Sequence, residues 1–93
     1  MAVLQESERL ALDRLLSYAL GKGKQNRIVA DYLLAWWDAE QYGAFDLQRS
    51  SALKDSVLED MVAIFGFVSR CQLHPDALDY REPFEAIVRR WHT

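Results

Sequence analysis

The chain has 93 residues, of which 51% are hydrophobic and 27% charged, and its 14 acidic and 11 basic side chains give a net charge of −3. This composition is too apolar for a disordered segment, and the length leaves room for a single domain over residues 1–93. The acidic balance makes nucleic acid an unexpected partner.

The first predicted helix covers residues 6–20, where apolar side chains recur at steps of three and four. Gly21 is expected to end it, and residues 21–26 form a short polar connection. Asn26 is expected to cap a second helix, which runs to about residue 41 and ends at Gly43. We expect the buried face of that helix to contain Tyr32 and Leu33, together with either Ile28 or Val29 and one tryptophan.

Two tryptophans, Trp36 and Trp37, are neighbours in this second helix. Adjacent helical positions point about 100° apart, so one ring can enter the core while the other lies at its edge or outside it. We place Trp36 in the core and leave two arrangements open for Trp37. It either packs against Phe45 or Tyr42, or it forms with Tyr42 an exposed aromatic patch, the kind of surface that dominates protein interfaces. Trp37 and Tyr42 are therefore the candidate protein-binding residues.

Residues 44–51 are the hardest to interpret, and we expect Phe45 and Leu47 to tuck under the neighbouring helices. Ser51 or Asp55 can cap the third long helix. This helix is apolar on more than half of its circumference, which is typical of a central helix contacted on several sides. Its apolar residues are Val57, Leu58, Met61, Val62, Ile64, Phe65, Phe67 and Val68.

Residues 73–76 break the third helix, since the residue before Pro75 disfavours helical backbone. Pro83 fits the first turn of a last helix whose inner face holds Phe84, Ile87, Val88 and Trp91. No segment requires a strand. The predicted fold is all-α, a compact bundle of about four helices joined by short connections.

Several features predict a cytoplasmic protein that makes no membrane contact. The longest uncharged apolar stretches, 32–37 and 61–68, fall far short of the roughly 20 residues that a membrane-spanning helix needs. The first residues lack the basic start and apolar run of a secretory signal. The single cysteine, Cys71, fits a reducing compartment.

A set of landmarks runs through most of the chain: Trp36-Trp37-Asp38-Ala39, Gly43, Phe45-Asp46-Leu47, Asp60-Met61, Phe65, Pro75-Asp76, Leu78, Tyr80, Phe84, Ile87-Val88 and Trp91. With these landmarks the chain resembles a family of small proteins of unknown function found in phages and integrative elements of proteobacteria. The resemblance covers roughly residues 10–91. It implies a shared fold and no activity, because most of the landmarks are apolar or turn-forming.

We predict no catalytic, cofactor or metal site. Cys71, His74 and His92 are too few and too scattered for the close ligand pairs of a zinc site. Carboxylates gather near Asp60 and Asp76, where helix starts favour negative charge anyway. Asp60 is expected to pair with a helix start or with an arginine such as Arg27 or Arg81. A small enzyme using these carboxylates remains the second alternative.

The first alternative to protein binding is nucleic-acid binding through two basic clusters. One comprises Lys22, Lys24 and Arg27, and the other comprises Arg89 and Arg90 near the end of the chain. Together they would form a basic patch if the fold brought them into contact, a point that the sequence leaves open. Arginines in a last helical turn also simply complement the helix dipole.

The sequence therefore favours a non-catalytic protein-interaction module. The setting of the resembling family favours a mobile-element protein that binds host machinery. The partner is unidentified, and a homodimer is a further option.

Overall fold

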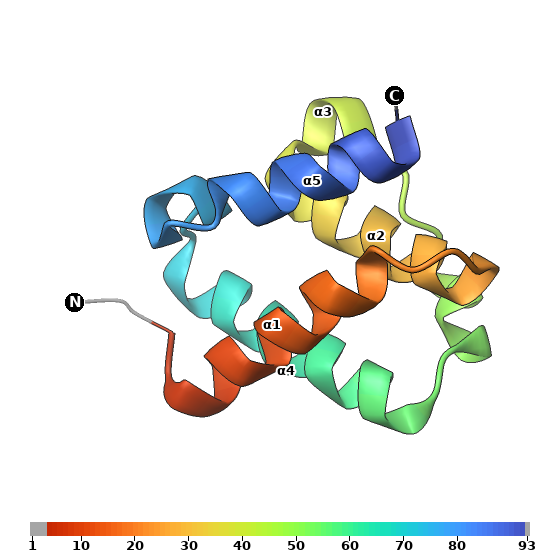
Figure 1. Cartoon of the computed structure of the whole chain (residues 1–93). Helices are drawn as coiled ribbons and strands as arrows, with labels where there is room; N and C mark the ends of the chain where they lie inside the picture. The colour runs from red at the N-terminus through yellow and green to blue at the C-terminus, as the bar shows by residue number, and fades with distance from the viewer. Residues whose placement is uncertain (1–3, 93) are drawn as a thin grey trace.

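Every regular element in the computed structural model, which describes residues 4–92, is helical (Figure 1). Four long helices carry the fold: α1 (Glu6–Ala19), α2 (Lys24–Trp37), α4 (Asp55–Cys71) and α5 (Arg81–His92). Between them lie α3 (Ala39–Tyr42) and two short 3-10 helices, η1 (Leu47–Ala52) and η2 (Pro75–Leu78). The predicted all-α bundle of about four helices is confirmed.

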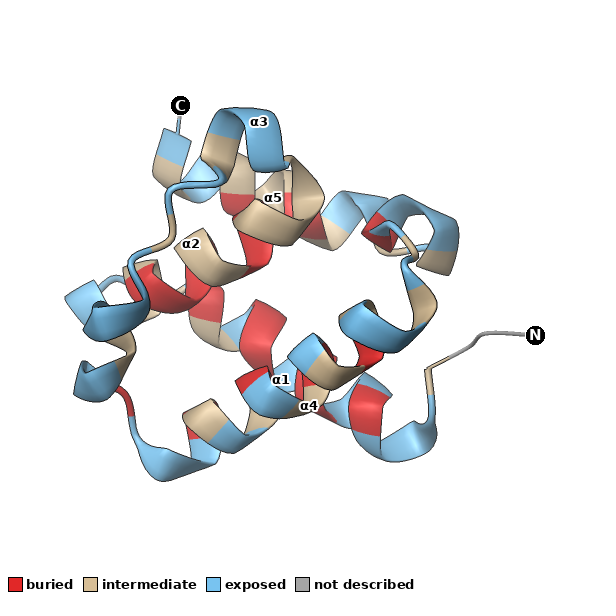
Figure 2. Ribbon diagram, turned by 180° about the vertical axis from the view of Figure 1, so that it is seen from behind, coloured by how far each residue is buried: buried red, intermediate tan, exposed pale blue. Residues whose placement is uncertain are grey.

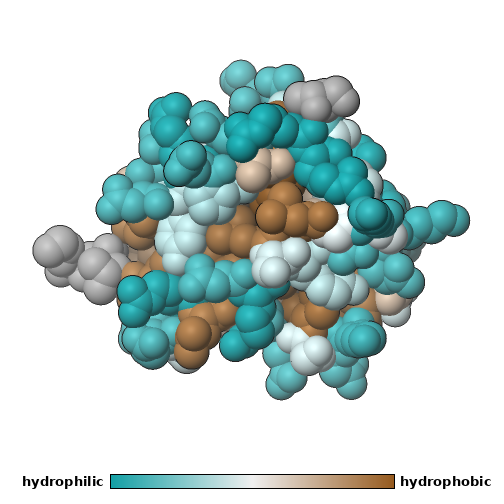
Figure 3. Space-filling view, in the orientation of Figure 1, coloured by the Kyte–Doolittle hydropathy of each residue, from teal (hydrophilic) through white to brown (hydrophobic). Residues whose placement is uncertain are grey.

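The helices pack in two pairs. Helix α1 crosses α4 closely, and α2 packs on both α1 and α5, so that α2 connects the α1–α4 pair to α5 (Figure 1). Figure 3 shows the face with α1 and α5 in front, where apolar side chains gather at the centre within a hydrophilic surround. The core residues that are least exposed come from all four long helices and include Leu12, Leu15, Val29, Leu33, Leu34, Ile64, Phe67, Phe84 and Ile87.

The second helix ends earlier than predicted, at Trp37. Asp38 leaves the helical conformation, with φ −153° and ψ 89°, and its carboxylate accepts a hydrogen bond from the backbone N–H of Gln41 at 3.3 Å. Aspartate competes well for such local backbone donors, and here it starts the separate short helix α3.

Asn26 connects two helices and is not the N-cap that we expected. The N-cap is Gly23, three residues earlier, and Asn26 Oδ1 accepts the Gly23 backbone N–H at 2.9 Å. Its Nδ2 donates to the carbonyl oxygen of Tyr18 at 2.7 Å, which ties the end of α1 to the start of α2. This close approach also explains Gly21, because a Cβ at that position would collide with the Asn26 amide.

The prediction that α4 is a central helix contacted on several sides is wrong. Helix α4 buries one face, with Val57, Met61, Ile64 and Phe67, chiefly against α1. On another face Val62 and Phe65 are 70% and 66% exposed. Figure 2 shows exposed positions along α4, whereas much of α2 is buried. A chain of this length supplies too few helices to cover every side of α4.

The prediction that Phe45 and Leu47 tuck under the neighbouring helices is correct for Phe45 and wrong for Leu47. Phe45 is half-buried, with its ring edge-on to Tyr32 at 5.5 Å between centroids. Leu47 is 77% exposed. It starts η1, which lies against α2 but leaves this side chain uncovered.

Glu8 is a buried carboxylate that ties α1 to α4. Its Oε1 accepts the backbone N–H of Gln5 at 3.0 Å, and Arg70 from α4 donates to its Oε2 at 2.5 Å. The backbone hydrogen bond from Gln5, aided by Arg70, holds the pKa of Glu8 below its usual value of 4.5 although burial acts in the opposite sense. The ionised form therefore stabilises the folded chain at neutral pH.

We expect Glu8→Gln to lower the free energy of unfolding by about 1 kcal/mol at pH 7, because glutamine can still accept the Gln5 N–H but cannot form the ion pair with Arg70. Because the pKa of Glu8 is lowered on folding, its contribution is complete above the unfolded pKa and disappears as the pH falls through the folded pKa. Urea unfolding at pH 7 and pH 3 should thus show a smaller difference between variant and wild type at pH 3. Equal differences at both pH values would contradict this account.

Candidate functional site

A strongly apolar depression lies between α2 and α4. It is a groove of about 510 Å³, bounded by α2, residues 45–50 and the outer side of α4. Its lining is almost wholly apolar and comprises Tyr32, Leu33, Ala35, Trp36, Phe45, Leu47, Ser50, Leu58, Met61, Val62, Ile64, Phe65 and Val68. Below, "the groove" denotes this set of residues.

The groove has a buried floor and an exposed rim. Leu33 and Ile64 are buried almost completely, whereas Leu47, Val62 and Phe65 are mostly exposed. Helix α4 packs mainly on α1, whereas α2 packs mainly on α1 and α5. The facing sides of α2 and α4 are therefore left without a third helix between them. Contiguous exposed apolar patches are surfaces at which proteins commonly bind partners or ligands.

Hydrogen bonds fix the aromatic walls of the groove. The Tyr32 hydroxyl, from α2, donates to the carbonyl oxygen of Met61, in α4, at 2.6 Å. Burial raises the pKa of Tyr32 to about 12, so this hydroxyl keeps its proton at neutral pH. Trp36 Nε1 donates to the carbonyl oxygen of Leu73 at 2.9 Å. The walls are therefore positioned before any ligand arrives, which lowers the ordering cost of binding.

Sequence reasoning missed the rim. It assigned Val62 and Phe65 to the core and Leu47 to a tucked loop. A signal was present, since α4 carries a buried stripe and, one residue further along, the second stripe Leu58, Val62, Phe65. Two parallel apolar stripes on one helix indicate either burial on two sides or one uncovered surface, and periodicity cannot distinguish these cases.

Trp37 and Tyr42 meet around a second, shallow depression, but neither ring stands free. The Trp37 ring stacks on Phe84 at 5.5 Å and 20° and lies 4.8 Å from the His74 ring. Tyr42 is half-buried beside the His92 ring, at 4.7 Å. The main aromatic neighbour of Trp37 is therefore Phe84, and the most exposed large apolar side chains lie at the groove instead.

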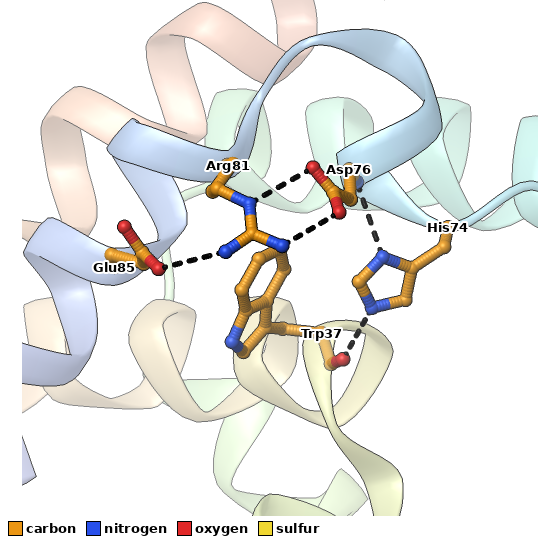
Figure 4. A network of polar contacts seen from close by, with 5 residues as sticks. All are labelled: Trp37, His74, Asp76, Arg81 and Glu85. Carbon is orange, nitrogen blue, oxygen red and sulfur yellow. Dashed lines mark hydrogen bonds and ion pairs between the residues drawn. The ribbon is translucent and has the colours of Figure 1, made fainter.

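A polar network surrounds Trp37 (Figure 4). His74 Nδ1 accepts the Asp76 backbone N–H at 3.1 Å, so Nε2 carries the proton that faces the carbonyl oxygen of Trp37 at 2.6 Å. Arg81 donates two hydrogen bonds to the Asp76 carboxylate, at 2.9 and 3.2 Å, and lowers its pKa. Arg81 also pairs with Glu85 at 3.5 Å. These groups satisfy one another and fasten η2 to α2 and α5.

Asp60 pairs with Arg14 and not with Arg27 or Arg81, which corrects the predicted partner. Two nitrogens of Arg14, from α1, donate to its carboxylate at 2.8 and 2.9 Å. The pair joins α1 to α4. Within residues 4–92 no three His, Cys, Asp or Glu side chains are grouped so as to hold a metal ion.

The two basic clusters do meet, at Trp91. The guanidinium carbon of Arg27 lies 5.3 Å from the Trp91 ring centroid and that of Arg90 lies 4.6 Å from it. Lys22, in the connection between α1 and α2, and Lys24, the first residue of α2, are both exposed. Arg89 lines the depression beside Trp37 instead. One basic site is therefore formed from the start of α2 and the end of α5, although Arg27 also pairs with Asp31 at 3.3 Å.

The comparisons with known proteins identify a family without assigning an activity. A model described as "Family of unknown function (DUF7673)" matches residues 9–92, which is most of the chain. No curated protein and no solved structure matches the sequence. Among residues 4–92, none of the helices combines the length and apolar character required to span a bilayer.

Proposed function

The chain belongs to the DUF7673 family of unknown function, and we propose that it is a non-catalytic module that binds protein through the groove between α2 and α4. The observation that carries this proposal is the rim of Leu47, Val62 and Phe65, exposed beside a preformed apolar floor. The apolar face of a helix is the natural occupant, because its side chains at steps of three and four can fill such a groove.

The shape favours a macromolecule over a small apolar ligand. A small molecule is normally enclosed by its pocket over most of its surface. Here the outward sides of Val62 and Phe65 would stay in water if only the floor were filled. A partner that also covers the rim removes this apolar area, and apolar area removed from water is the main source of binding free energy.

Absence of catalysis is part of the proposal. The polar side-chain groups that line the groove are the hydroxyls of Tyr32 and Ser50 and the indole N–H of Trp36. Each donates to a backbone carbonyl oxygen, that of Met61, Leu47 and Leu73 respectively. Asp60 and Asp76, the carboxylates of the enzyme alternative, are each held by two arginine nitrogens. We further propose a cytoplasmic setting. The candidate partners are a host protein, which the resemblance to phage and integrative-element proteins favours, and a second copy of the chain.

Nucleic-acid binding is the second candidate. It is favoured by the meeting of Arg27 and Arg90 on Trp91, with Lys22 and Lys24 alongside. It ranks lower because Asp31, shared between Arg27 and Arg49, offsets part of their charge, and because the chain as a whole carries −3. A phosphate footprint needs more positive charge than this.

We expect Phe65→Glu to abolish binding of the protein partner. A tagged chain would be used to capture proteins from a nuclease-treated lysate of the source organism, with quantitative mass spectrometry as readout. A partner that depends on the groove should fall at least about tenfold, the usual effect of losing a central aromatic contact. Leu10→Glu is the matched control, because Leu10 is 47% exposed on α1 and does not line the groove.

The same experiment separates the candidates. A protein retained by Leu10→Glu and lost with Phe65→Glu supports the groove. Capture that survives Phe65→Glu contradicts it. Nucleic acid that is recovered when nuclease is omitted would favour the basic site instead, provided that it is lost with Arg90→Ala and also when the salt concentration is raised.

A further inference from the structure

The outer face of α4 has the pattern of a helix that packs on another helix. Leu58, Val62, Phe65 and Ser69 follow one another at steps of four, three and four, the spacing of a helix–helix seam. Val62 and Phe65 form the apolar centre of this seam, and Asp55 and Ser69 make its two ends polar. Helix α4 therefore carries both one wall of the groove and a projecting apolar ridge.

A ridge beside a groove on one surface can fit a second copy of itself. In a two-fold dimer the same patch contacts itself, so that each copy must supply both the projecting and the receiving part. Here the ridge of Val62 and Phe65 lies next to the floor of Leu33 and Ile64. When two α4 helices run in opposite directions, Val62 of each copy lies opposite Phe65 of the other.

Charges on α4 also select this antiparallel arrangement. Its first half carries exposed acidic groups, Asp55 and Glu59, whereas Arg70 is the basic residue in its last turn. The guanidinium of Arg70 reaches back toward the seam, because a Cβ at Gly66 would lie 3.3 Å from its Nη1. Its other terminal nitrogen, Nη2, donates to Glu8, and the Arg70 side chain as a whole is 59% exposed.

An antiparallel pair places Glu59 of each copy beside Arg70 of the other copy. A parallel pair would instead bring Glu59 against Glu59 and align the two helix dipoles, and both effects oppose association. No foreign helix has to be assumed to supply the complementary charges, since α4 itself carries them.

We propose that the groove is occupied by α4 of a second copy of this chain, in a two-fold antiparallel dimer with Glu59–Arg70 pairs at both ends. This inference rests on the proposed function, because it uses the same groove and names its occupant.

The test is a charge exchange followed by sedimentation equilibrium on the full chain. Glu59→Lys and Arg70→Glu should each weaken self-association on the order of tenfold, since each homodimer then places like charges at both ends. An equimolar mixture should recover the dimer. In the mixed dimer the two substituted positions face each other with opposite charges at one end, and the unchanged Glu59 and Arg70 face each other at the other end. Glu82→Lys, an exposed change of the same charge on α5, should leave association unchanged.

Recovery in the mixture supports the inference and also shows that both variants fold. A wild-type chain that stays monomeric over a wide concentration range overturns it. So does a mixture that fails to restore the dimer while both variants keep the helical circular dichroism of the wild type, a check needed because Arg70 also holds Glu8. The two proposals can fail independently. If the chain is monomeric but Phe65→Glu still removes a captured protein, the dimer is wrong and the groove binds a different partner. If Phe65→Glu changes neither self-association nor protein capture, both proposals fail.

Discussion

Replacing Phe84 with alanine is expected to lower the free energy of unfolding by about 3–5 kcal/mol, the range for a fully buried phenylalanine. Phe84, on α5, has no exposed surface. Trp36 meets it edge-on at 5.7 Å and 87°, and Trp37 stacks on it at 5.5 Å. Removing the ring would leave a cavity between two large aromatic groups that are held from other sides and cannot easily close in.

Phe65→Ala is the matched control, since it makes the same chemical change at an exposed position of α4. Its cost should stay within about 1 kcal/mol. Urea unfolding of dilute protein measures both variants, because dilution removes any contribution from self-association. Equal losses at the two positions would mean that Phe65 is covered in the single chain and that the groove rim is not a free surface.

The contrast between these two phenylalanines shows what the sequence predicts and what it does not. On the predicted inner face of α5, Phe84 and Ile87 are fully buried, whereas Val88 and Trp91 are only partly buried. The spacing of apolar residues identifies faces of a helix. It does not say how many of those faces find a neighbour, and for α4 that number depends on where α2 and α5 pack.

Contacts between residues that are far apart in the sequence were not predictable either. Arg14 and Asp60 are 46 residues apart, and the pairing was assigned to the wrong arginine. The meeting of Arg27 and Arg90 at Trp91 was left open for the same reason, because it depends on how the end of α5 lies against the start of α2. The local sequence pattern predicts each helix separately, whereas tertiary packing determines which helix ends come into contact.

Helix boundaries failed where a polar side chain competes with the helix. The Asp38 carboxylate accepts a hydrogen bond from the backbone N–H of Gln41, and α2 ends at Trp37, about four residues before the expected end. This early stop matters for the tryptophan pair. It places Trp37 in the last turn of α2, where His74 can hydrogen-bond to its carbonyl oxygen.

Trp37→Ala is therefore expected to cost about 2–3 kcal/mol, less than a fully buried tryptophan but far more than a surface one. An exposed aromatic patch predicts almost no loss. A packed ring predicts a large one, because the Trp37 ring has Phe84 on one side and His74 near it. Urea unfolding gives the total effect.

A double-mutant cycle with Phe84→Ala isolates the contact itself. Stacked aromatic pairs contribute about 0.5–1.5 kcal/mol beyond the area that they bury, so the double variant should lose less than the sum of the single variants by about that amount. Tyr42→Ala provides the comparison, since Tyr42 packs on His92 and not on Phe84. If the losses in free energy of unfolding for Trp37→Ala and Phe84→Ala are strictly additive, and the loss for Trp37→Ala is small, Trp37 is a surface residue. Trp37 would then be tested for partner binding before the rim of the groove.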